Sequence, residues 1–324
     1  MRKNVFGLLA AVLLLVTAST GAAQPAKVFK IGALVPGDAW YEIIDGLKSG
    51  LKQLGLEEGR QFILSVQDWQ GDAKLGQAAA KKFEQDNVDL IYTTSTGSTI
   101  AAKRATENIP VVFCAGTDPV ALGLVDSFAA PGGRLTGVYY RDTDLTAKRL
   151  EILKELVPKL HRVVTFYNPR TTVAIESSKL AREAAAQMGL RLIEHHYTSV
   201  KELQAGIQAL KAGDAEAFFA VADPEVDNQS KLIIDVAKSR RLATSFSRQS
   251  FVLNGGFSSY SVSFHEVGRL SAKYVQRILN GVKPKDLPVE GVDKIELFIN
   301  LKTAKQIGLT VPPNVLARAD RVIR

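Results

Sequence analysis

Short apolar runs alternate with amphipathic stretches of helical period along this chain, and that alternation limits the folds it can adopt. Strand-like runs lie at 28–35, 61–67, 88–93 and 110–114. Between them, apolar residues recur at helical spacing in the stretches 41–54, 72–86 and 98–106. A β–α–β–α order of this kind predicts a parallel sheet with helices on both faces.

The same order restarts in the second half of the chain. Strands are predicted at 162–167, 190–196, 215–221 and 242–246, with helices at 172–188, 200–210 and 228–240. No low-complexity linker separates the two halves. We therefore expect two doubly wound α/β lobes with parallel sheets, joined by crossing strands rather than by a flexible tether.

The N-terminal residues have the order of an export signal. Arg2 and Lys3 precede an apolar run at 6–16, and small residues follow up to Ala23. The apolar run falls short of the ~20 residues that span a bilayer, which favours a signal peptide of residues 1–23 over a retained anchor. No cysteine follows the run, so we expect a periplasmic protein without a lipid anchor.

Charge and cysteine content argue against several functions. The formal net charge is +8, but Lys and Arg are scattered rather than clustered, which argues against a nucleic-acid partner. Cys114 is the single cysteine and lies in an apolar run, where we expect an inert core thiol. The four histidines lack metal-ligand spacing with Cys or acidic residues, so we predict neither a metal site nor a cofactor.

Ligands of open parallel sheets bind beyond the carboxyl ends of the strands, and six polar segments follow predicted strands here. They are residues 36–40, 94–98, 115–119, 168–171, 222–225 and 245–249. If the two lobes face each other, these segments meet across one cleft.

Several phrases of the sequence carry a family resemblance. They include Gln70-Gly71-Asp72, Ile109-Pro110-Val111-Val112-Phe113, Thr117-Asp118-Pro119-Val120, Tyr167-Asn168-Pro169, Ile299-Asn300-Leu301-Lys302-Thr303-Ala304 and Gly308-Leu309-Thr310-Val311-Pro312-Pro313. In order and spacing they resemble the substrate-binding proteins of ATP-driven importers with the type 1 periplasmic-binding fold, in the subgroup linked to tryptophan and tyrosine uptake. The resemblance extends over nearly the whole chain after the signal.

The resemblance implies three chain crossings between the lobes, near Tyr139, Tyr260 and Phe298. The first lobe would then comprise residues 27–139 plus 260–297, and the second lobe 140–259 plus 298–324. The resemblance also implies a monomer that closes on a small-molecule ligand and delivers it to the transmembrane permease subunits of an ABC importer.

Two positions depart from the family pattern, which has an acidic stretch before the second crossing and an aspartate after it. This chain has Arg248 and Ser263 there. A binding role tolerates these changes, but they weaken the case for an aromatic amino acid. The implied ligand is therefore a small polar or zwitterionic molecule, with amino acids among the candidates.

Residues of the polar segments are candidates for binding the charged groups of such a ligand. Thr94, Ser95 and Ser98 could present hydroxyls and helix N-terminal amides to a carboxylate, although ordinary N-capping uses the same groups. Asp118 and Asp223 could each accept an ammonium group, or form a turn with their own backbone.

Other candidates are aromatic, cationic or polar. Trp40 and Tyr41 could stack on a flat ligand or pack at a helix start. Arg248 could clamp an anionic ligand. Thr117 and Asn168 complete the predicted ligand-binding set through their place in these segments.

Sequence motifs of common enzymes are missing. The chain has no Gly-x-Ser-x-Gly elbow, no Walker-type loop and no dinucleotide fingerprint after its first strand. We therefore predict no catalytic residues and a binding function, with the importer component as the leading hypothesis. The alternatives are a ligand-sensing partner of a membrane signalling receptor and an exported α/β enzyme.

Overall fold

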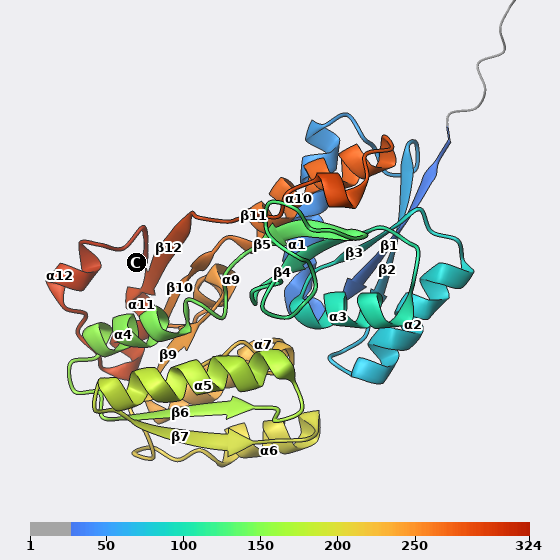
Figure 1. The fold of residues 1–324 in the computed structure, drawn as a ribbon. Helices are drawn as coiled ribbons and strands as arrows, with labels where there is room; N and C mark the ends of the chain where they lie inside the picture. Colours follow the sequence, from blue (N-terminus) through green and yellow to red (C-terminus); the bar gives the residue numbers. More distant parts are fainter. Residues whose placement is uncertain (1–26) are drawn as a thin grey trace, which may run out of the picture.

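The computed structural model describes residues 27–324, which form two sheets with helices on both faces of each (Figure 1). The strand orders are β11-β5-β4-β3-β1-β2 and β13-β12-β10-β9-β8-β6-β7. Every pairing between these strands is parallel except that of β10 with β12. The prediction of two doubly wound α/β lobes is confirmed. The predicted signal peptide lies outside the described residues.

The six-stranded sheet and its helices form what we call the first lobe. Its strands are β1 (Phe29–Val35), β2 (Phe62–Asp68), β3 (Leu90–Thr93), β4 (Val111–Ala115), β5 (Leu135–Tyr139) and β11 (Glu290–Gly291). One face carries α1 (Tyr41–Gln53) and α10 (Phe264–Leu279), and the other carries α2 (Ala73–Gln85) and α3 (Thr96–Ala105). Two short 3-10 turns, η1 (Asp38–Trp40) and η2 (Pro284–Asp286), complete it.

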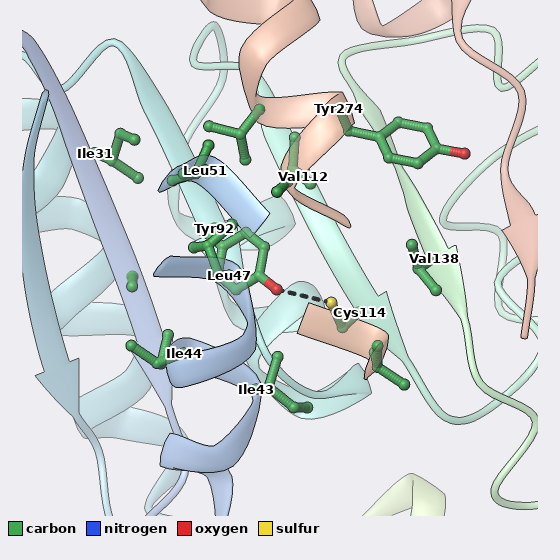
Figure 2. Close-up of a cluster of buried hydrophobic side chains, with 14 of the residues drawn as sticks. Ile31, Ile43, Ile44, Leu47, Leu51, Tyr92, Val112, Cys114, Val138 and Tyr274 are labelled. Carbon is green, nitrogen blue, oxygen red and sulfur yellow. Dashed lines mark hydrogen bonds between the residues drawn. The ribbon is translucent and has the colours of Figure 1, made fainter. Parts of the chain in front are cut away.

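Two helices from distant parts of the chain, α1 and α10, close one core of the first lobe. A Cβ atom at Gly46 would lie 2.0 Å from the His265 carbonyl oxygen, so glycine lets the two backbones touch. Beneath them, Tyr92 Oη lies 3.0 Å from Cys114 Sγ (Figure 2). Cys114 is fully buried, which confirms its predicted core position, and burial raises the pKa of its thiol to about 12.

The seven-stranded sheet and its helices form the second lobe. Its strands are β6 (Arg162–Tyr167), β7 (Arg191–His196), β8 (Ala217–Phe219), β9 (Ala243–Phe246), β10 (Ser258–Val262), β12 (Ile295–Asn300) and β13 (Arg321–Ile323). Its helices are α4 (Thr146–Leu156), α5 (Thr172–Gln187), α6 (Val200–Ala209), α7 (Pro224–Asn228), α8 (Ser230–Arg240), α9 (Gln249–Leu253), α11 (Leu301–Ile307) and α12 (Pro313–Leu316).

The chain passes between the lobes three times, after β5, after β10 and after β11. A buried arginine ties two of these passages together. Arg149 Nη2 donates to Asp142 Oδ1 at 2.7 Å in the first passage, and Arg149 Nε donates to the carbonyl oxygen of Tyr260 at 3.3 Å in β10. The predicted residue boundaries of the lobes stay a prediction.

Some elements differ from the sequence-based expectation. The helix predicted at 228–240 is α8, which starts at Ser230. The short helix α7 before it, which Pro224 begins with Asp223 as its N-cap, was not expected. The strand β5, at 135–139, was not expected from the sequence. Among residues 27–324, no helix has the length and apolar character needed to span a bilayer.

Candidate functional site

A small cavity of about 20 Å³ lies between the two lobes where their strand orders reverse. In the first sheet, β2 and β3 lie on opposite sides of β1, so the strand order reverses between β1 and β3. In the second sheet, β7 and β8 lie on opposite sides of β6, so the order reverses between β6 and β8. Loops that follow such strands form ligand crevices in open α/β sheets. The cavity is lined by Trp40, Ser95, Thr96, Gly97, Gly116, Tyr140, Asp142, Val173, Ala222, Asp223, Pro224 and Asp227.

The start of α3 forms the wall of the cavity on the side of the first lobe. Ser95 is the N-cap, and its Oγ accepts a hydrogen bond from the Ser98 amide at 3.0 Å. Thr96 and Gly97, the first two residues of the helix, line the cavity. Amides at these positions have no acceptor within a helix and carry its positive dipole end, so this wall favours an anionic group.

A second loop of the first lobe is held rigidly behind that wall. Thr96 Oγ1 accepts hydrogen bonds from the amides of Gly116 at 3.1 Å and Thr117 at 3.2 Å. A Cβ atom at Gly116 would lie 2.7 Å from the ring of Tyr140. The glycine therefore lets this aromatic side chain reach the cavity.

The second lobe contributes acidic side chains to the cavity. Asp223 caps α7, and its two carboxylate oxygens accept from the amides of Asn168 at 2.8 Å and Glu225 at 3.0 Å. Its side chain is buried at the cavity wall, and burial raises the pKa of its carboxyl group. A buried carboxylate in this position suits a cationic ligand group.

Two more acids stand next to Asp223 on α7. Burial raises the pKa of Glu225 to about 7, with a further contribution from the charge of Asp223. Burial also raises the pKa of Asp227 to about 6, although Arg248 opposes that shift. Oδ1 of Asp227 is buried without a hydrogen-bond partner. The second lobe therefore places several carboxyl groups near the cavity whose ionised forms are disfavoured by burial and mutual repulsion. A cation bound there would favour their ionised forms.

Arg248 is fully buried beside the cavity but does not line it. Its Nε donates to Asp227 Oδ2 at 3.0 Å within the second lobe, and its Nη1 donates to the carbonyl oxygen of Ala39 at 3.0 Å in the first lobe. Its guanidinium carbon lies 3.9 Å from the ring centres of both Trp40 and Phe264. Protein groups thus engage Nε and Nη1, whereas Nη2 is buried without a hydrogen-bond partner within residues 27–324.

A wider chamber of about 140 Å³ adjoins the inner cavity. The two spaces share Gly97, Val173, Asp223 and Pro224. Trp69 forms one wall of this outer chamber, and the exposed Arg104 and Arg170 reach it from opposite lobes. No group of His, Cys, Asp and Glu within 27–324 has the arrangement of a metal site.

Only part of the predicted ligand-binding set lines the inner cavity. Trp40, Ser95 and Asp223 do. Asp118 instead holds a turn, since its Oδ1 accepts from the amides of Val120 at 2.8 Å and Ala121 at 3.1 Å. The others that lie outside the lining are Tyr41, Thr94, Ser98, Thr117, Asn168 and Arg248.

Several of these residues support the lining from behind. Ser98 Oγ accepts from Trp69 Nε1 at 3.0 Å, Thr117 Oγ1 lies 2.8 Å from Thr143 Oγ1, and Thr94 Oγ1 donates to Leu34 at 3.2 Å. The lining residues that the sequence-based prediction missed are Thr96, Gly97, Gly116, Tyr140, Asp142, Val173, Ala222, Pro224 and Asp227. Five of them lie inside the marked polar segments and could have been found: Thr96, Gly97, Gly116, Ala222 and Pro224.

Comparison with known proteins gives one family and several relatives. The family described as ABC transporter substrate binding protein matches residues 29–323. A tyrosine-binding protein of Clostridioides difficile (strain R20291) is 27% identical over 284 residues, which is 87% of this chain and 81% of the relative.

Two solved structures share the fold. A conserved domain protein from Vibrio cholerae has a TM-score of 0.83 and 29% identity, covering 92% of this chain and 100% of the other. An ABC domain from Streptococcus pneumonia, solved in complex with L-Trp, has a TM-score of 0.82 and 24% identity, with the same coverage. The predicted two-lobed periplasmic-binding fold is thereby confirmed.

Proposed function

This chain belongs to the family of ABC transporter substrate binding proteins, and we propose that it captures a zwitterionic amino acid between its lobes. The observation that carries the proposal is the polarity of the inner cavity. The α3 start of the first lobe faces the buried Asp223 of the second across this space. A ligand that bears a carboxylate and an ammonium group satisfies both walls at once.

The proposal orients the ligand. Its carboxylate would meet the amides of Thr96 and Gly97, and its ammonium group would meet Asp223, with Asp142 and Asp227 close by. Its side chain would extend into the outer chamber against Trp69. Because the ligand would contact groups on both lobes, its binding would stabilise the closed arrangement of the lobes, as in other two-lobed proteins that close around ligands.

The relatives support an amino acid as the ligand class. One is named for tyrosine and another was solved with L-Trp. The charged end of the ligand would meet the walls of the small inner cavity, and a large side chain would extend into the wider outer chamber. L-tyrosine and L-tryptophan therefore head the candidates, followed by non-aromatic amino acids and then short peptides and organic acids.

A thermal-shift screen of these compounds tests the proposal. A ligand at 100 times its Kd stabilises the folded protein by about 2.7 kcal/mol, which shifts the melting temperature measurably. We expect an L-amino acid to shift it, and its N-acetylated and amidated forms, which lack one charge, to fail. A shift by organic acids alone would show that the ligand is anionic and that Asp223 does not bind an ammonium group.

The proposed role is uptake, with a permease as the partner of the closed, monomeric protein. We propose that the protein acts in the periplasm after removal of residues 1–23, without a lipid anchor and without a catalytic activity. Mass spectrometry of the exported protein should find a mature start at Gln24. Genes for a permease and an ATPase beside its own would support import over receptor signalling, and turnover of the bound ligand would contradict the binding role.

A further inference from the structure

Arg248 lies beside the cavity, and its charged group contacts protein groups of both lobes. It follows β9 and pairs with Asp227 of α7, so both ends of this ion pair belong to the second lobe. Its other contacts belong to the first lobe: the carbonyl oxygen of Ala39 and the rings of Trp40 and Phe264.

The first-lobe partners form a corner around the guanidinium group. The rings of Trp40 and Phe264 are 5.9 Å apart and nearly perpendicular, at 86°. The guanidinium carbon of Arg248 lies 3.9 Å from each ring centre, and the side chain is fully buried. Guanidinium groups are weakly hydrated and stack well on aromatic faces, so this contact favours the buried position.

A second contact between the lobes lies beside it. Asn228, at the end of α7, donates from Nδ2 to the carbonyl oxygen of Pro36 at 2.8 Å. A Cβ atom at Gly37 would lie 2.1 Å from that amide nitrogen, so the loop after β1 has the shape to receive α7. Both contacts join protein atoms to protein atoms, and separation of the lobes breaks them.

We infer that Arg248 is a closure latch, a positioning residue that favours the closed arrangement of the lobes through the chain's own contacts. It acts on capture by holding Trp40, a wall of the cavity, against the second lobe. A latch of this kind raises the fraction of protein that is competent to bind and lowers the apparent Kd by the same factor. The inference rests on the proposed capture between lobes, but its test uses no ligand.

The experiment compares variants of the refolded, ligand-free protein by small-angle scattering. Arg248→Ala removes the latch, and Arg248→Met keeps its apolar stem while it removes the charge and the bond to Ala39. Arg182→Ala is the matched control, because Arg182 pairs with Glu194 inside the second lobe alone. Circular dichroism verifies that each variant is folded. If Arg248→Ala does not fold, the scattering comparison is made with Arg248→Met alone.

We expect a compact profile for the wild type and for Arg182→Ala, and a larger radius of gyration for both Arg248 variants. The open population should rise at least about tenfold, because a desolvated cation–π contact and a charged hydrogen bond are lost together. An open profile for the wild type would overturn the inference, and so would compact profiles for the folded variants.

Tryptophan fluorescence gives a local readout that loss of stability alone would not change. Trp40 and Trp69 are the two tryptophans of the chain, so Trp69→Phe leaves Trp40 as the only emitter. Trp40 is 4% exposed in the closed arrangement. Arg248→Met in this background should make Trp40 accessible to acrylamide well below the unfolding temperature, and unchanged quenching would contradict the latch.

Discussion

The two lobes share the order of their first five strands, yet they present opposite chemistry to the cleft. The first lobe offers the start of α3, with Ser95 as its cap and the backbone of Thr96 and Gly97 at the cavity. The second lobe offers the short helix α7, whose cap is Asp223 and which carries the further acids Glu225 and Asp227. Each lobe thus places the N-terminus of a helix at the cavity, but only the helix of the second lobe carries acidic side chains there.

The difference shows how a repeated fold can bind an asymmetric ligand. In the first lobe the proposed binding groups are backbone amides, which substitution of a side chain leaves in place. In the second lobe they are carboxylates, which one substitution removes. We therefore expect the second lobe to be more sensitive to mutation in its binding function, and the following experiments measure that asymmetry.

The largest effect should come from Asp223→Asn. This change keeps hydrogen-bonding capacity at the cap of α7 but removes the charge that would face the ligand ammonium group. Charged hydrogen bonds contribute ~1.5–3 kcal/mol, so the Kd for the amino acid from the screen should rise at least about tenfold. Isothermal titration calorimetry measures the Kd of the wild type and of the variant.

The matched control lies in the other lobe. Asp118→Asn changes an aspartate that also follows a strand and precedes a proline, but that holds a turn outside the cavity. Its Kd should equal that of the wild type. Equal losses at Asp118 and Asp223 would show that the proposed contrast between the lobes is wrong.

Ser95→Ala should have a smaller effect on binding than Asp223→Asn. Loss of an N-cap costs about 1 kcal/mol of stability, yet the first amides of α3 remain at the cavity. Ser199→Ala is the control, since Ser199 caps the equally long α6 in the second lobe, away from the cavity. Thermal unfolding should show similar losses for both, and calorimetry should show weaker binding for Ser95→Ala alone.

The acids of α7 should make binding depend on pH. A ligand ammonium group favours ionised carboxylates, so the affinity should fall as the pH drops through about 7 and about 6, where Glu225 and Asp227 take up protons. Titration calorimetry in buffers of different ionisation enthalpy would detect the protons released on binding near pH 6.5. No buffer dependence would show that these acids do not respond to the ligand.

Stability of the ligand-free protein should change with pH in the opposite direction. The pKa of Glu225 is raised from 4.5 to about 7, so the folded state binds a proton that the unfolded state lacks between those values. Unfolding free energy should therefore rise as the pH falls through this window. Glu225→Gln should flatten the rise, and a stability that instead increases with pH there would contradict the assigned shift.

The smallest effect is expected at Cys114 of the first lobe. Its thiol is fully buried and its pKa is raised to about 12, so a thiol reagent should leave the native protein unlabelled at neutral pH. Labelling in increasing urea then reports the opening of the first lobe separately from the whole molecule. Rapid labelling of the native protein would show that this core is open.

The strands and helices around the cleft could be predicted because their residues carry strong local patterns. Ile43, Ile44 and Leu47 repeat at helical spacing and are buried in α1 as that spacing requires. The strand β5 was not assigned because its few residues, Leu135–Tyr139, follow a loop rich in Pro and Gly and show no clear period. Short elements such as α7 depend on tertiary contacts more than on pattern.

The sequence could predict which loops form the candidate site, because these loops follow predicted strands, but not which of their side chains line the cavity. Trp40, Ser95 and Asp223 follow strands and line the cavity, but Thr94 and Thr117 follow strands equally and support the wall from behind. Which side chain of a loop faces the ligand depends on backbone direction, which a single sequence does not reveal. Contacts between lobes, such as Arg248 with Ala39, depend on how the lobes meet.

The packing of α1 against α10 determines when the first lobe can be completed during synthesis. Residues of α10, among them Val267, Tyr274 and Val275, belong to the same buried cluster as Ile31 and Leu47 near the start of the chain. A nascent chain therefore carries an exposed apolar face on its earliest helix until almost all of the second lobe has been made. The lobe that is translated first is finished late, because its core is incomplete until α10 has been made.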